Sequence, residues 1–132
     1  QALNTAHDGS LSTGHANSPK DMISRLETMV LMGMDLPLPA IERQIASGLD
    51  IIVHLGRLRD KSRKVLEVTE VLGYWDGQIH LQTIYRYEEI RKEDENVTEN
   101  EKKDQENKVH GEWKKVAELF HREKLVAAGY YI

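Results

Sequence analysis

The 132-residue sequence contains no cysteine, which excludes disulfide bonds, thiolate metal sites and cysteine nucleophiles together. Proline and phenylalanine are scarce, with three residues and one residue respectively. No apolar run approaches the ~20 residues that a helix needs to cross a bilayer. The first residues also lack the basic and apolar regions of a signal peptide. A cytoplasmic origin is therefore the default expectation, and the abrupt start at Gln1 indicates a fragment of a longer protein.

Charged residues are plentiful but nearly balanced in sign. They make up 30% of the chain, and 18 basic side chains stand against 22 acidic ones, which gives a net charge of −4. This balance does not favour nucleic-acid binding, which calls for a strongly basic surface. The hydrophobic fraction of 39% is sufficient for a modest core.

Two amphipathic helices are predicted in the first half of the chain. Ser18 can accept a free backbone N–H as an N-cap, and Pro19 suits the first helical position. Helical spacing continues to Gly33 through one apolar face, formed by Met22, Ile23, Leu26, Met29 and Val30. A second helix is predicted from Pro39, with Ile41, Ile45 and Leu49 spaced four apart.

Strands are predicted before and after these helices. Residues 10–16 are rich in β-favouring residues between turn residues and predict one short, partly buried strand. Three further runs with strand character follow at residues 50–58, 65–75 and 78–87. Asp76-Gly77 is a strong signal for a tight hairpin turn, because type I′ turns require positive φ. These three strands therefore predict an antiparallel β-meander.

The last third of the chain divides into two parts. Residues 88–108 contain nine acidic and five basic side chains with almost no apolar ones, which predicts a solvated linker. A final helix is predicted from about Glu112 to near Gly129, with an apolar face formed by Trp113, Val116, Ala117 and Phe120.

Several segments resemble, in the same order, those of one protein family. The run Asn-Thr-Ala-His-Asp-Gly-Ser-Leu-Ser-Thr-Gly-His-Ala-Asn-Ser-Pro at 4–19 resembles the histidine box of the type II/type IV secretion ATPases. The closest branch is the one that drives Tad/Flp-type pilus assembly. Residues 25–32, 40–47, 57–60 and 68–71 are similar to the helices and meander that follow the box, and 125–129 resemble the branch's C-terminus.

This resemblance implies a fold, a division of the chain and an activity. The expected fold is α/β: a partial RecA-like ATPase core with one core strand, two helices and the meander, plus a C-terminal helix. Residues 1–87 would be the C-terminal part of the ATPase domain, 88–108 a charged linker and 109–132 a C-terminal helical segment. The intact parent would be an ATP- and Mg-dependent hexameric motor, peripheral at the inner membrane, that works with secretion or pilus platform proteins.

The phosphate-binding loop of that family is not found in the chain. No G-x-x-x-x-G-K-[ST] motif occurs, so no row of backbone N–H groups is predicted to cradle phosphates. The chain alone is therefore not expected to bind or hydrolyse ATP, and no cofactor or metal is expected for it. Loss of the neighbouring core would expose its first strand and Met-rich helix face, so we expect self-association, strand exchange or repacking of residues 1–20.

The resemblance assigns two histidines, His7 and His15, to the histidine box, where an imidazole could report the nucleotide state. The alternative for both histidines is a purely structural role, as a helix cap or at the edge of the core. The remaining histidines have no metal-binding spacing and are interpreted as surface residues: His54, His80, His110 and His121.

Two other functions are open at this point. The chain could be a non-catalytic assembly module that acts only through subunit or partner contacts. It could also bind an acidic ligand through the basic turn formed by Arg57, Arg59, Lys61, Arg63 and Lys64, although a solvated turn explains these charges as well.

Overall fold

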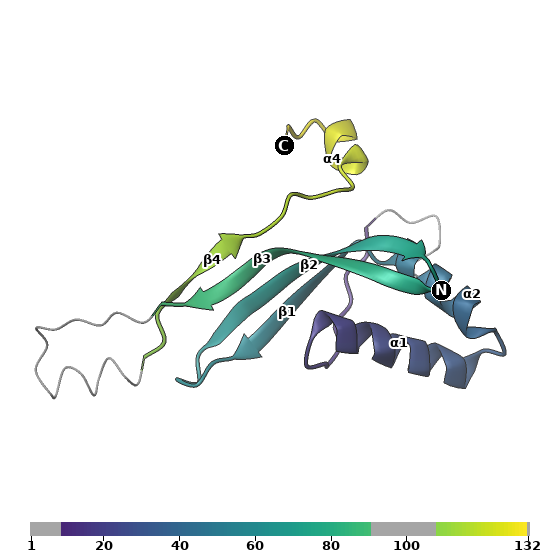
Figure 1. Ribbon diagram of the computed structural model, residues 1–132, viewed down its shortest axis with the longest axis horizontal. Helices are drawn as coiled ribbons and strands as arrows, with labels where there is room; N and C mark the ends of the chain where they lie inside the picture. Colours follow the sequence, from purple (N-terminus) through teal and green to yellow (C-terminus); the bar gives the residue numbers. More distant parts are fainter. Residues whose placement is uncertain (1–8, 91–107, 132) are drawn as a thin grey trace, which may run out of the picture.

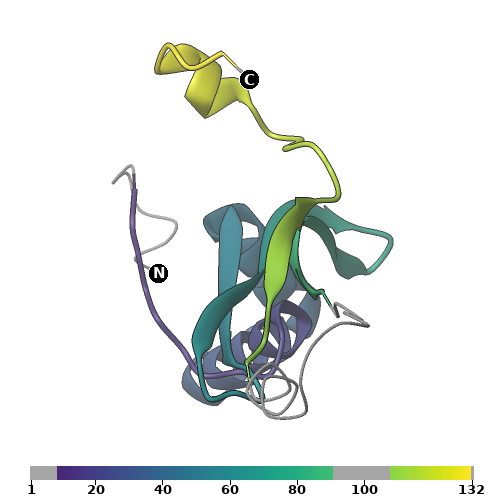
Figure 2. The same ribbon diagram turned by 90° about the vertical axis from the view of Figure 1, so that its left-hand side faces the viewer.

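The computed structural model describes residues 9–90 and 108–131. Within them lie three helices and four strands that form one antiparallel sheet with the order β1-β2-β3-β4. Figure 1 shows α1 and α2 on one side of this sheet and the C-terminal segment on the other side, and Figure 2 agrees. The elements are α1 (Pro19–Gly33), α2 (Leu38–Gly48), β1 (Ile51–Arg57), β2 (Arg63–Trp75), β3 (Gln78–Glu89), β4 (Gly111–Lys115) and α4 (Glu123–Ala127).

The start of α1 agrees with the sequence prediction. The Ser18 side chain accepts the backbone N–H of Asp21 at 3.0 Å, and Pro19 lies in the first turn. Asp21 adds a negative charge to the positive end of the helix dipole and also accepts the backbone N–H of Asn17 at 2.9 Å. The helix ends at Gly33, as predicted. Local capping chemistry therefore fixes where α1 starts and where the segment before it ends.

The hydrophobic core lies between the two long helices and the sheet. Its centre is formed by Ile23, Ile41 and Ile45, of which Ile41 is fully buried. Partly buried side chains from α1, from the linkers that follow α1 and α2, and from strands β1 and β3 pack around it: Leu26, Val30, Leu36, Leu49, Ile52, Ile79 and Leu81. The apolar periodicity of both helices therefore predicts the face that covers the sheet, except at Met29, which is 67% exposed.

The predicted meander is confirmed. Strands β1, β2 and β3 pair antiparallel, and the hairpin between β2 and β3 turns at Asp76 and Gly77, which have φ angles of 52° and 73°. Positive φ at both positions is the requirement of a type I′ turn.

The prediction of a strand at residues 10–16 is wrong, because the described residues of this segment have no strand structure. A strand needs a neighbour for its backbone N–H and C=O groups. None of the four strands of the sheet pairs with this segment. The predicted single core strand is therefore not formed, and residues 9–17 run as an extended connection into α1.

The prediction of a long C-terminal helix from Glu112 is also wrong. Residues Gly111–Lys115 form β4, which pairs with β3, and α4 has only five residues. The Trp113 ring packs edge-on against Tyr87 with centroids 5.4 Å apart, and its Nε1–H donates to the Val65 carbonyl at 2.7 Å. These contacts with distant strands outweigh the local helical spacing of the apolar residues.

The linker prediction is tested only at its edges. Glu88 and Glu89 belong to β3 and not to a linker, and residues 91–107 lie outside the described residues. In the predicted C-terminal helical segment, the described residues contain the strand Gly111–Lys115 and a helix only at Glu123–Ala127.

Candidate functional site

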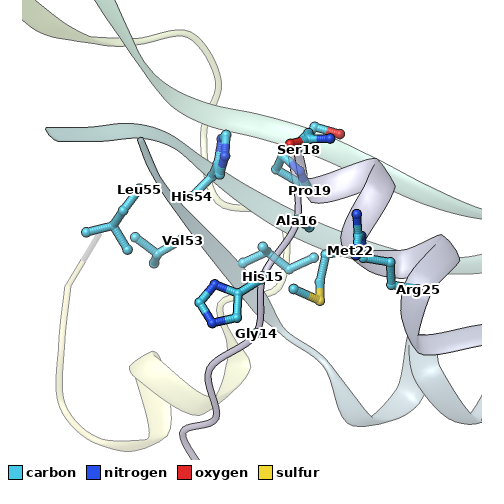
Figure 3. A pocket seen from close by; sticks show the side chains of 12 residues that line it. Gly14, His15, Ala16, Ser18, Pro19, Met22, Arg25, Val53, His54 and Leu55 are labelled. Carbon is cyan, nitrogen blue, oxygen red and sulfur yellow. The ribbon is translucent and has the colours of Figure 1, made fainter. Parts of the chain in front are cut away.

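A shallow hollow of about 510 Å³ lies where the segment before α1 runs beside β1 (Figure 3). Twelve residues line it, from three elements of the chain: Gly14, His15, Ala16, Asn17, Ser18, Pro19, Met22, Arg25, Ile52, Val53, His54 and Leu55. Since it contains one of the two histidines assigned by sequence resemblance, it is the candidate site of the described chain.

His15 lies at this hollow with its side chain exposed. Figure 3 shows its ring on the same side of β1 as Val53, whereas His54 extends from the other side of the strand. This difference follows from the strand geometry, because successive side chains point to opposite faces. Sequence reasoning placed His54 on the surface, whereas the structure places it half-buried in the hollow. His7 lies outside the described residues.

The charges at the hollow do not favour a bound phosphate. Arg25 is the one lining residue with a permanent positive charge, and its Nε lies 3.0 Å from the Asp21 carboxylate. The backbone N–H of Asn17 and the Arg25 side chain hold the pKa of Asp21 below its usual range. The nearby N-terminus of α1 is already capped by Ser18. The one permanent positive charge that lines the hollow is therefore already paired with a carboxylate.

One wall of the hollow is apolar and continues along β1. Exposed fractions are 40% for Ile51, 49% for Val53 and 65% for Leu55. These three side chains share the face of β1 that points away from the helices, because Ile52 between them packs toward the core. Since β1 is also the edge strand, this apolar row lies beside backbone groups that no other strand of the described sheet pairs.

The basic turn between β1 and β2 is organised around an acidic residue. Asp60 accepts the Ser62 hydroxyl at 2.5 Å and the Val109 backbone N–H at 2.9 Å. These hydrogen bonds lower the pKa of Asp60 to about 2, and the one from the Ser62 hydroxyl has the largest effect. Arg59 forms an ion pair with Glu89 at the end of β3. The turn thus connects β1 and β2 to the start of the C-terminal segment.

Sequence reasoning missed the most buried charged residue that the structure describes. Glu70 is 1% exposed, and its two carboxylate oxygens accept the backbone N–H groups of Phe120 and His121, each at 2.8 Å. An acidic residue within the apolar run from Val65 to Leu72 is the signal that could have identified it, because buried charges require partners.

No cluster of three or more His, Asp or Glu side chains among the described residues is arranged to hold a metal ion. No helix in this part of the chain is long and apolar enough to cross a membrane.

Comparison with known proteins identifies the family. The profile of the type II/IV secretion system proteins matches residues 1–115. The chain belongs to this family. Helices α1 and α2, the meander and strand β4 all fall within the matched residues, whereas α4 lies beyond them.

Two curated relatives share part of the sequence. They are named "Putative conjugal transfer protein" and come from the CDC 1551 and H37Rv strains of Mycobacterium tuberculosis. Each is 32% identical over 84 residues, which is 64% of this chain and 23% of the relative. The chain therefore matches less than a quarter of the length of these proteins.

Proposed function

We propose that this chain is part of an ATP-driven secretion motor of the Tad/Flp pilus-assembly branch. The observation that carries the proposal is the family match, which extends over residues 1–115. The two relatives named for conjugal transfer support a role in a transfer process. In such a motor, the parts that hold ATP and Mg²⁺ would be supplied by other segments of the protein, and the assembly would be a hexamer at the inner membrane.

The residues of this chain supply a contact rather than the nucleotide site. His15 lies exposed on the segment that runs into the capped start of α1, and α1 packs on the core. An imidazole in this place can donate or accept a hydrogen bond near neutral pH. We assign His15, with His7, the role of reporting the state of the motor to α1 and the core.

A non-catalytic assembly module is the second candidate. The exposed apolar row of Ile51, Val53 and Leu55 on an edge strand favours it, since such surfaces in folded proteins are commonly covered by partners. Other subunits and membrane platform proteins would be the partners in either case, and the net charge of −4 argues against nucleic acid.

Calorimetry with an ATP analogue and Mg²⁺ tests the first part of the proposal on this chain. We expect no heat of binding, because the sequence lacks a phosphate loop and the hollow lacks a free cation. Clear micromolar binding would contradict this account.

The role of His15 is tested by measuring ATP hydrolysis in a protein that contains both this segment and a phosphate-binding loop. His15→Ala should lower the rate of ATP hydrolysis while ATP binding is kept. His54→Ala, at the same hollow, is the matched control and should leave the rate unchanged. Equal rates for wild type and His15→Ala would favour the assembly module.

A further inference from the structure

The segment that follows β4 crosses the sheet on the face opposite α1 and α2 (Figures 1 and 2). We call residues 116–131 the strap. Its first ties are to β3, where the Ile84 carbonyl accepts the N–H groups of Val116 at 2.7 Å and Ala117 at 3.4 Å. Its last tie is an ion pair of 3.6 Å between Lys124 and Asp50, next to the start of β1. The strap therefore passes over the strands in the order β3, β2, β1.

The central ties of the strap are on β2, and they are the strongest. Both oxygens of Glu70 accept consecutive N–H groups, those of Phe120 and His121, each at 2.8 Å. The His121 ring nitrogen Nε2 also lies 2.7 Å from the Leu72 carbonyl oxygen. Hydrogen bonds to a charged acceptor contribute more than neutral ones, so Glu70 dominates the attachment.

Apolar burial contributes little to this attachment. No side chain from residue 116 to 131 is buried, and the exposed fractions of Phe120 and Val126 are 69% and 59%. The sheet and helices, by contrast, are held by a core that includes the fully buried Ile41. The strap and the rest of the fold thus depend on different interactions, and segments with few buried apolar contacts open first.

We propose that Glu70 is the latch of a detachable strap. While its carboxylate holds both N–H groups, the strap lies across the sheet and positions α4 beside the start of β1. When the latch is lost, the strap opens as one unit, and α1, α2 and strands β1 to β3 stay folded. Opening exposes Glu70 and the outer face of β2 to solvent or to a partner.

Hydrogen exchange of the backbone amides tests the latch. Glu70→Gln leaves one acceptor oxygen and turns an NH₂ group toward the second N–H. We expect the amides of residues 119–122 to exchange roughly tenfold faster, in line with the loss of one charge-assisted hydrogen bond. The amides of α2 and of the β2–β3 pairing should keep their protection.

Glu67→Gln is the matched control on the same strand. Glu67 accepts the hydroxyls of Thr69 and Thr83, which both lie in the sheet and not in the strap, so this change should leave the exchange of residues 119–122 unaltered. Unchanged exchange of these amides in Glu70→Gln would overturn the proposal. A uniform rise in all elements would overturn it as well, because Glu70 would then support the whole sheet.

A second variant removes the contact with Glu70 by a substitution in the strap. The residue changed is Phe120, whose side chain is exposed, so the core is not disturbed. Phe120→Pro removes the N–H that donates to Glu70. Faster tryptic cleavage after Arg122 and Lys124, with β2 and β3 still protected, is the expected result. Loss of protection in β2 and β3, or cleavage at the wild-type rate, would contradict a detachable strap.

Discussion

Asp60 and Glu70 are carboxylates whose main partners include backbone N–H groups from far along the chain. Asp60 takes the N–H of Val109, 49 residues later, and Glu70 takes that of Phe120, 50 residues later. At both positions a side-chain carboxylate accepts a backbone N–H group that, within a sheet, the carbonyl of a neighbouring strand would accept. Single substitutions at these residues therefore act on the C-terminal segment more than on the turn that holds Asp60 or the strand that holds Glu70.

The titration of Asp60 is a prediction at this scale. Its pKa is lowered from 3.8 to about 2, so the ionised form is favoured in the folded state. The stability that this carboxylate contributes is fully present above pH 3.8 and is lost as the pH falls through about 2. An NMR titration of the Asp60 carboxyl carbon measures the midpoint directly.

Ser62→Ala provides the internal check, because the Ser62 hydroxyl is the largest cause of the lowered pKa. This variant should move the midpoint of Asp60 upward toward 3.8, whereas Thr28→Ala on the distant helix α1 should not. A wild-type midpoint already near 3.8 would show that the hydrogen bonds at Asp60 are not formed in solution.

The elements that could be predicted from the sequence are those fixed by local chemistry. Ser18 and Pro19 set the start of α1, and Asp76-Gly77 set the turn between β2 and β3. The strand predicted at residues 10–16 and the long helix predicted from about Glu112 both fail, because the structure of these segments depends on partners distant in sequence. Trp113 is the clearest example, since Val65 and Tyr87 decide its conformation.

The candidate site could be predicted only in part. Sequence resemblance singled out His15, which does line the hollow, but the histidine of the neighbouring strand, His54, could not be placed there without the fold. The pairing of Arg25 with Asp21 follows from their spacing of four on one helix, although its consequence for phosphate binding required the geometry of the hollow.

Gly111→Ala is a prediction about the element β4. A Cβ at this position would clash with the Glu88 carbonyl oxygen and the Tyr87 ring, and a backbone carbonyl cannot move aside easily. We expect a loss of about 1–3 kcal/mol, the usual cost of overpacking, concentrated in the pairing of β4 with β3. Denaturant unfolding and exchange of the Trp113 indole N–H report on the two effects.

Gly33→Ala is the matched control, because a Cβ there meets nothing within 4 Å and the position ends a helix without a positive φ. It should leave stability nearly unchanged. Equal effects of the two substitutions would mean that β4 is not packed against β3 as described.

Self-association is the prediction for the whole molecule. The edge strand β1 presents the apolar row of Ile51, Val53 and Leu55, so the chain should form larger species as its concentration rises. Val53→Lys should shift sedimentation velocity profiles toward the monomer, since a charge on an edge strand opposes pairing. Gln78→Lys, at the exposed start of β3, adds the same charge away from this edge as a control.

A monodisperse monomer at high concentration would count against that prediction. An equal effect of Val53→Lys and Gln78→Lys would attribute any change to net charge rather than to the edge of β1.

The position of the strap after the sheet in the sequence has a consequence for synthesis. Glu70 is made 50 residues before Phe120. At about 5–20 residues per second, a ribosome needs roughly 3–10 s to add the residues between them. Each nascent chain therefore passes through an interval of seconds in which Glu70 has no strap to bind, and a chaperone or assembly partner can reach the outer face of β2 before the strap first closes over it.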